Sequence, residues 1–257
     1  MAITREQIIE CIRHAAESLP NVNAMWLGGS DSFGLADEYS DCDIQMDVID
    51  GTEEETYAVI EAELAKLSPI KHTWALPLPT WHSHHQRFYL LRDASVYALV
   101  DLVLMARSST RRLNERELHG EPVVLFDKLG VIHSTANDKD AQRKKLAEAL
   151  QQHQLQARMF EGFFPKNVAR GNLGGAFMEH ITFVLRRLQQ VLRMRYDPHR
   201  FEFSLRYAPQ DLPPAVAEEL TQLCFVSDLE DLKRKHARAR EWFWQEAEAL
   251  DVESLEL

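Results

Sequence analysis

The sequence has few cysteines, fewer basic than acidic residues and no long apolar run, and each shortage disfavours a class of protein. The three cysteines, Cys11, Cys42 and Cys224, are scattered, which argues against a disulfide framework or a zinc site and favours a reducing, cytoplasmic compartment. The longest apolar run, at 96–105, is too short to span a bilayer as a helix, so no membrane segment is expected. Charged residues are interspersed among the apolar ones at 1–19, which predicts an amphipathic helix and not a secretory signal.

The charge balance bears on the partners. Lysine and arginine number 29 against 40 aspartates and glutamates, a net charge of −11. Proteins that hold long nucleic acids usually present a basic surface to the phosphate backbone, so a nucleic-acid partner is disfavoured. An acidic cleft would instead attract a cationic small molecule. A bound triphosphate would need local positive charge, from metal ions or from a few basic side chains.

A glycine-serine turn lies between two predicted strands. The run at 24–27 is apolar, and 41–48 shows alternation and β-branching, so both predict strands. Gly28, Gly29 and Ser30 follow the first strand. Glycine lets the backbone approach a ligand closely, and the amides and hydroxyl of such a turn can donate to phosphate oxygens.

Two carboxylates open the second strand. The strand period of two places Asp41 and Asp43 on one face and Cys42 on the other. Two carboxylates so placed can share divalent ions, as phosphoryl and nucleotidyl transfer require. Taken alone, the glycine turn is typical of an ordinary loop and the Asp-x-Asp pattern of a solvated strand. The chemical interpretation depends on their combination.

That combination, Gly-Gly-Ser at 28–30, Gly34 and Ser-Asp-x-Asp at 40–43 before an apolar strand, resembles the signature of the DNA polymerase beta-like nucleotidyltransferase superfamily. The resemblance implies that Asp41 and Asp43 bind Mg²⁺ or Mn²⁺ ions that carry a nucleoside triphosphate. It also implies a third carboxylate on a neighbouring strand. Asp101 is the candidate, because it lies within an otherwise apolar run where an unpaired charge would be costly.

The chain divides into two halves by periodicity. Thr4 and Thr52 begin capping-box patterns that precede apolar residues at helical spacing, which predicts two helices. Strand-like runs lie at 24–27, 41–48, 74–78, 87–91, 96–105 and 123–126. After Gly130 long helical patterns take over, at 137–164, 173–195, 214–225 and 228–250. The prediction is an α+β fold: a nucleotidyltransferase core at 1–130, with a mixed β-sheet flanked by helices, then an all-α helical bundle domain at 131–257.

This order resembles the two-domain antibiotic (aminoglycoside-type) nucleotidyltransferases. The resemblance implies an active site between the core and a helical domain that helps to hold the acceptor. In the helical half, Phe177, Ile181, Val184, Leu188 and Val191 form an apolar stripe that predicts bundle core. Arginines 186, 187, 193 and 195 lie largely off that stripe. Arg187 is the preferred contact to the triphosphate among several candidate cations.

The histidine cluster at 82, 84 and 85 lacks the spacing of a zinc site, so a surface or substrate-lining loop is predicted there. The expected activity is metal-dependent transfer of a nucleoside monophosphate, AMP from ATP, to a hydroxyl of a small acceptor such as an aminoglycoside-like antibiotic. Asp101 would ligate a second ion or accept the hydroxyl proton. Three alternatives stay open: a toxin-like enzyme that AMPylates proteins, a nucleic-acid-end transferase, and a catalytically silent nucleotide-binding module.

Overall fold

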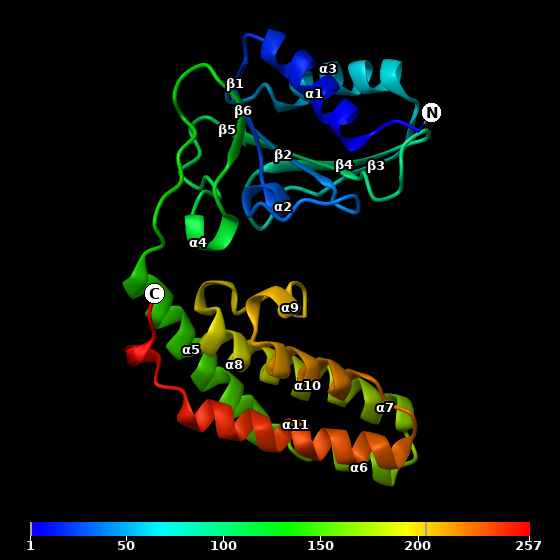
Figure 1. The fold of residues 1–257 in the computed structure, drawn as a ribbon, viewed down its shortest axis with the longest axis vertical. Coiled ribbons are helices and arrows are strands. Elements are labelled where there is room, and N and C mark those ends of the chain that lie inside the picture. The colour runs from blue at the N-terminus through cyan, green and yellow to red at the C-terminus, as the bar shows by residue number, and fades with distance from the viewer. Residues whose placement is uncertain (1, 204) are drawn as a thin grey trace. The chain divides into compact units, whose positions relative to one another are not determined.

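The computed structural model describes residues 2–203 and 205–257. Contacts between Cα atoms divide the chain into two compact units, Met1–Asn137 and Asp138–Leu257. The first unit is α/β and the second is helical (Figure 1). The expected α+β class is confirmed, with a mixed sheet and flanking helices followed by a helical region.

The first unit is built on a six-stranded sheet in the order β3-β4-β5-β2-β1-β6 (Figure 1). Its strands are β1 (Val22–Leu27), β2 (Cys42–Val48), β3 (Ile70–Ala75), β4 (His85–Leu91), β5 (Val100–Ala106) and β6 (Val123–Asp127). The neighbours β2 and β5 run parallel, and the other neighbouring pairs are antiparallel. The chain therefore crosses over between the two central strands through the segment that contains helix α3 (Glu53–Leu67), β3 and β4.

Two helices, α1 (Arg5–Ser18) and α3 (Glu53–Leu67), cover one face of the sheet (Figure 1). The core under them joins apolar side chains of both helices to alternate residues of the central strands, including Ile12, Ile60, Ile44 and Leu102. The strand period of two sends the residues between them to the opposite face. That opposite face carries Asp43 and Asp101.

The two predicted capping boxes have different outcomes. Thr4 forms one: its hydroxyl accepts from the Gln7 amide, and the Gln7 side chain accepts from the Thr4 amide. The prediction for Thr52 is wrong, because its hydroxyl donates to the Ile49 carbonyl at 2.6 Å and makes no capping bond. The helix nevertheless begins at the next residue.

Two predicted strand boundaries are also wrong. The run at 74–78, in which Pro77 and Pro79 were expected to mark a loop or an edge, corresponds to the edge strand β3, which begins earlier, at Ile70, and ends at Ala75 before the prolines. β5 begins at Val100 and not at 96, since the preceding residues form a turn closed by the Ala98 amide and the Ser95 carbonyl. The apolar composition alone did not separate this turn from the strand.

The second unit is a helical bundle without strands in its described residues. Its helices are α5 (Lys139–Met159), α6 (Phe163–Ala169), α7 (Leu173–Met178), a π-helix (Glu179–Leu185), α8 (Arg186–Tyr196), α9 (Ala208–Asp211), α10 (Pro214–Cys224) and α11 (Leu229–Ala249), with 3₁₀ turns at Pro198–Arg200 and Val252–Ser254. Among residues 2–203 and 205–257, the structure contains no helix with the length and apolarity to cross a membrane.

The π-helix shifts the phase of the predicted apolar stripe. Leu188 and Val191 are buried as expected, but Phe177 is 39% exposed and Leu185 is buried in its place. A wider turn moves the side chains before it to another face of the helix. Arg193, which was placed off the stripe, is fully buried and pairs with Asp211 at 2.8 Å.

Candidate active site

The two central strands bring Asp43 and Asp101 together. Asp43 on β2 is the register partner of Asp101 on β5 in the parallel pair. Neighbouring strands lie about 4.8 Å apart, and paired residues project from the same face. Two carboxylates that are distant in sequence therefore stand side by side on the face that α1 and α3 leave uncovered.

The glycine-serine turn packs directly on Asp43. Gly29 begins the one-turn helix α2 (Gly29–Ser32) with φ at +54°, in the left-handed region that favours glycine. A Cβ at Gly29 would lie 1.7 Å from Asp43 Oδ2, so a side chain has no room there. The Gly28 amide donates to the Asp43 carbonyl at 2.9 Å. This bond uses the Gly28 amide within the sheet and leaves Gly29 and Ser30 at the start of the helical turn.

Burial controls the protonation of Asp101. It raises the pKa of this carboxyl to about 6, and the negative charge of Asp41 adds to the shift. A hydrogen bond acts in the opposite direction, because Gln86 Nε2 donates to Asp101 Oδ1 at 2.6 Å. Asp101 is therefore a carboxyl whose proton affinity lies near neutrality, which suits a group that exchanges a proton with a substrate.

Arg5 connects the glycine turn to the start of β2. Its Nε donates to the Asp41 carbonyl at 2.7 Å, and its Nη2 pairs with the Asp31 carboxylate. The Ser30 hydroxyl donates to Ser40 Oγ at 3.1 Å. These contacts fix the segment between the turn and the carboxylates from both ends.

Sequence reasoning missed Arg5 and Gln86. Arg5 is the first residue of α1, and a charged residue at the start of a helix is typical of an ordinary surface position. Gln86 is in β4, in antiparallel register two residues from the partner of Asp101. Strand periodicity could have placed Gln86 on the carboxylate face, but only once the β4–β5 register was known.

The loop that carries the histidine cluster reaches the surface through Trp81, which is 72% exposed, but two of its three histidines are buried. His82 is 2% exposed and His84 is 1% exposed, whereas His85 is partly exposed on β4. Thr80 Oγ1 donates to the His84 carbonyl at 2.6 Å and closes the turn. The imidazole rings of His82 and His84 stack with their centroids 5.4 Å apart. Contacts within the loop and with Gln86 and Arg111 hold this segment, and composition does not reveal them.

The carboxylates of Asp41, Asp43 and Asp101 suit an ion such as Mg²⁺, which needs few protein ligands. Among residues 2–203 and 205–257, no three His, Cys, Asp or Glu side chains are already gathered into a metal-binding cluster. Mg²⁺ commonly binds one or two carboxylates and completes its shell with water and substrate phosphates. The register-paired Asp43 and Asp101, with Asp41 close enough to raise the pKa of Asp101, offer oxygen ligands of that type.

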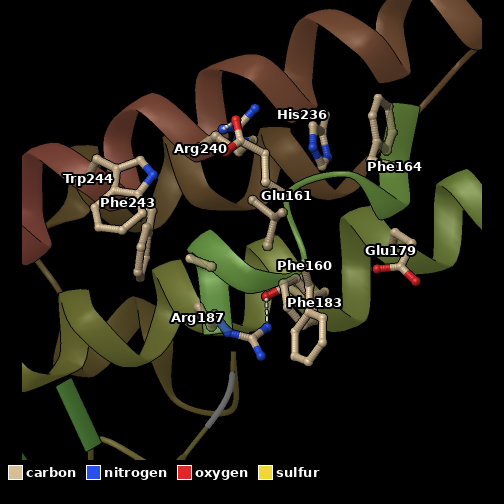
Figure 2. A pocket seen from close by; sticks show the side chains of 12 residues that line it. Phe160, Glu161, Phe164, Glu179, Phe183, Arg187, His236, Arg240, Phe243 and Trp244 are labelled. Atoms are coloured by element: carbon tan, nitrogen blue, oxygen red, sulfur yellow. Dashed lines mark hydrogen bonds and ion pairs between the residues drawn. The ribbon is translucent and has the colours of Figure 1, made fainter. Parts of the chain in front are cut away.

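Arg187, the predicted triphosphate contact, belongs to the helical unit. It lines a pocket between α5, the π-helix and α11, together with Phe160, Phe183 and Trp244 (Figure 2). Its Nη1 donates to the Phe183 carbonyl at 2.6 Å, and its guanidinium lies 3.4 Å from the centroid of the Phe183 ring. Burial, with the neighbouring charge of Arg186, lowers the pKa of Arg187 to about 10.

Comparison with solved structures shows a likeness in fold. No family model matches the chain, and no curated protein sequence matches it. The structure is similar to the crystal structure of an aminoglycoside 6-adenyltransferase from Bacillus subtilis, over 96% of this chain and 90% of the other, with a TM-score of 0.35 and 13% identity. A likeness at this level transfers neither residues nor substrate from one protein to the other.

Proposed function

We propose that the protein is a metal-dependent nucleotidyltransferase that moves a nucleoside monophosphate, AMP from ATP, to a hydroxyl of a small molecule. The observation that carries the proposal is the register pairing of Asp43 with Asp101 beside a glycine turn packed on Asp43. Two carboxylates and the amides of an adjacent glycine turn are groups that phosphoryl chemistry uses for charge neutralisation and phosphate binding. The motif at 28–43 supports the same reading.

The three carboxylates would have different roles in the reaction. Asp41 and Asp43 would hold Mg²⁺ or Mn²⁺, which when bound neutralises charge on the triphosphate. Asp101 would be a further ligand or would accept the proton of the acceptor hydroxyl, as its raised pKa allows. The acceptor oxygen forms a bond to the α-phosphorus, the bond from that phosphorus to the bridging oxygen breaks, and pyrophosphate leaves with the electron pair.

Phosphate contacts would come from the glycine turn. The Gly29 and Ser30 amides begin a helical turn, where the first N–H groups have no partner within the helix. The Gly28 amide is already bonded to the Asp43 carbonyl. The role of Gly28 would be steric, because a Cβ at this position would lie 2.6 Å from Gln45 Nε2, and glycine allows the end of the strand to approach Gln45. Arg187 remains a proposed contact to the triphosphate.

An aromatic surface continues the carboxylate row and supports a ring-containing substrate. Phe88 on β4 is the register partner of Asp101, and Trp74 on β3 is the partner of Phe88. The Trp74 and Phe88 rings stack at 5.3 Å, and Trp74 is 61% exposed. With the acidic balance of the chain, this surface favours a cationic, ring-built acceptor, and an aminoglycoside-like antibiotic is the class to test first.

The test uses ATP labelled at the α-phosphate, Mg²⁺, a panel of aminoglycosides and a cell lysate. The wild-type protein should transfer label to a small molecule and release pyrophosphate, and Asp43→Asn should do neither while keeping its circular dichroism spectrum. Label on protein would replace the small-molecule acceptor with a protein acceptor. Nucleotide binding without transfer to any acceptor would indicate a silent binding module, and equal activity of Asp43→Asn would refute the assignment of the site.

A further inference from the structure

A chain of hydrogen bonds runs from the backbone of a buried loop to the Asp101 carboxylate. The His84 amide donates to His82 Nδ1 at 3.1 Å. His82 Nε2 lies 2.9 Å from Gln86 Oε1, and Gln86 Nε2 donates to Asp101 Oδ1 at 2.6 Å. The loop supplies the first two residues of this chain and β4 supplies the third.

The direction of each bond is fixed by the one before it. His82 Nδ1 lies 3.2 Å from Thr80 Oγ1 and also receives the bond from the His84 amide. A backbone N–H can only donate, so Nδ1 is the unprotonated, accepting nitrogen in that bond. The proton of neutral His82 is then on Nε2, which donates to the carbonyl oxygen of the Gln86 amide. That bond sets the amide orientation, so the Gln86 NH₂ group faces Asp101 and can only donate to it.

The loop holds the chain of bonds rigidly. His82 is 2% exposed and Thr80 is 9% exposed, and the Thr80 hydroxyl ties the turn to the His84 carbonyl. His84 stacks on His82, and burial with the nearby His82 ring lowers the pKa of His84 to about 4, so the stacked ring stays neutral near pH 7. These contacts fix the position of the His82 ring, and its Nε2–H tautomer is the one that serves both the bond from His84 and the bond to Gln86.

We propose that His82 and Gln86 are positioning residues for Asp101: His82 orients the Gln86 amide, and Gln86 occupies Oδ1, which leaves Oδ2 for a metal ion. The proposal rests on the proposed function, since it gives the orientation of a carboxylate in that site. Ligand carboxylates are commonly held by such outer partners, whose loss typically costs tenfold or more in metal affinity.

Two substitutions of His82 separate positioning from packing. The side-chain amide of Gln can place a donor where Nε2 lies, whereas that of Asn reaches only the region of Nδ1. His82→Gln should therefore keep the bond to Gln86, and His82→Asn should keep the bond from His84 but lose the one to Gln86. Gln86→Leu removes the donor to Asp101. His72→Asn, at an exposed position on β3, is the matched control.

The readout is calorimetric binding of Mn²⁺ alone to the full chain, with thermal unfolding recorded for every variant. Asp101→Asn should weaken Mn²⁺ binding, and Gln86→Leu and His82→Asn should each weaken it by about tenfold. His82→Gln should stay within about twofold of the wild type, by the same reasoning, and His72→Asn should not change it. Equal affinity of His82→Asn and His82→Gln, with Asp101→Asn still defective, would overturn the positioning role and leave the proposed function standing.

Other outcomes are equally decisive. Mn²⁺ binding that is absent in the wild type, or unchanged in both Asp43→Asn and Asp101→Asn, would overturn the proposed function and the positioning role together. If the loop variants fail to fold, a measurement on the wild-type protein still tests the proposal. Nitrogen chemical shifts of the wild-type imidazoles should show His82 as the Nε2–H tautomer, and an Nδ1–H tautomer would refute the chain of bonds.

Discussion

Replacing Asp101 with asparagine should stabilise the metal-free protein at neutral pH while abolishing turnover. Asparagine keeps an oxygen that can accept from Gln86 and removes the ionisable group. The pKa of Asp101 is about 6 in the folded protein against an ordinary value of 3.8. Each unit of pKa difference corresponds to about 1.4 kcal/mol, so ionising Asp101 costs the folded state roughly 3 kcal/mol, and partial exposure lowers this to about 1–3 kcal/mol.

The sign follows from the raised pKa. Between about pH 4 and 6 the folded state binds more protons than the unfolded state, so the free energy of unfolding of the wild type falls as pH rises. The favourable term is fully present below the unfolded pKa and is lost as pH passes the folded pKa. The advantage of Asp101→Asn should therefore be largest at pH 7.5 and smaller at pH 4.5, by up to about 2 kcal/mol.

Urea unfolding in EDTA at these two pH values measures the effect. Asp127→Asn is the matched control of opposite sign. Burial would raise the pKa of Asp127, but backbone amides led by that of Ile132 lower it overall. The stability that Asp127 contributes is thus present above its unfolded pKa of 3.8 and lost only as pH falls below that value, so its replacement should cost nearly the same at pH 7.5 and at pH 4.5. An Asp101→Asn effect that is independent of pH would refute the reasoning.

Three further predictions concern the glycine turn and the metal. Gly29→Ala should reduce both stability, by about 1–2 kcal/mol from the left-handed backbone alone, and nucleotide binding, because its Cβ meets Asp43. Gly34→Ala shares the positive φ but has open space around its Cβ, so equal loss of nucleotide binding in both variants would contradict the role of the contact. Asp43→Asn should lose pyrophosphate release, measured by a coupled phosphate assay. Its free energy of unfolding, measured by urea melts, should stay within about 1 kcal/mol of the wild type. ATP affinity measured by calorimetry should fall when EDTA removes divalent ions, since clustered carboxylates repel a bare triphosphate; equal affinity would place the nucleotide elsewhere.

The sequence predicts well what depends on local patterns. Thr4 forms its capping box because both partners lie within one turn, and the Gly29 turn lies beside Asp43 because only a short segment separates them. The resemblance and the cost of a charge in an apolar strand led to the expectation that Asp101 lies on a strand next to that of Asp43. In the structure β5 is the parallel neighbour of β2, and its register with β2 was not predicted.

What the sequence does not predict depends on contacts that tertiary packing decides. The bond from Gln86 to Asp101 depends on the register of two strands, which periodicity leaves undetermined. The burial of His82 depends on a loop that folds on itself, and polar composition indicates the opposite. The π-helix at Glu179–Leu185 changes which side chains of the surrounding helix face the core, and its residue types do not indicate a π-helix.

The parallel pairing of β2 and β5 also has a consequence for how the protein comes into being. Antiparallel strands can pair as soon as a short turn closes, but a parallel pair must wait for a crossover, here the segment containing α3, β3 and β4. Closing that long connection is entropically costly and slow compared with local contacts. The carboxylate pair therefore does not exist in a nascent or partly refolded chain until β5 has joined the sheet. Acquisition of divalent-ion affinity would accordingly mark the joining of β5 to the sheet during biosynthesis.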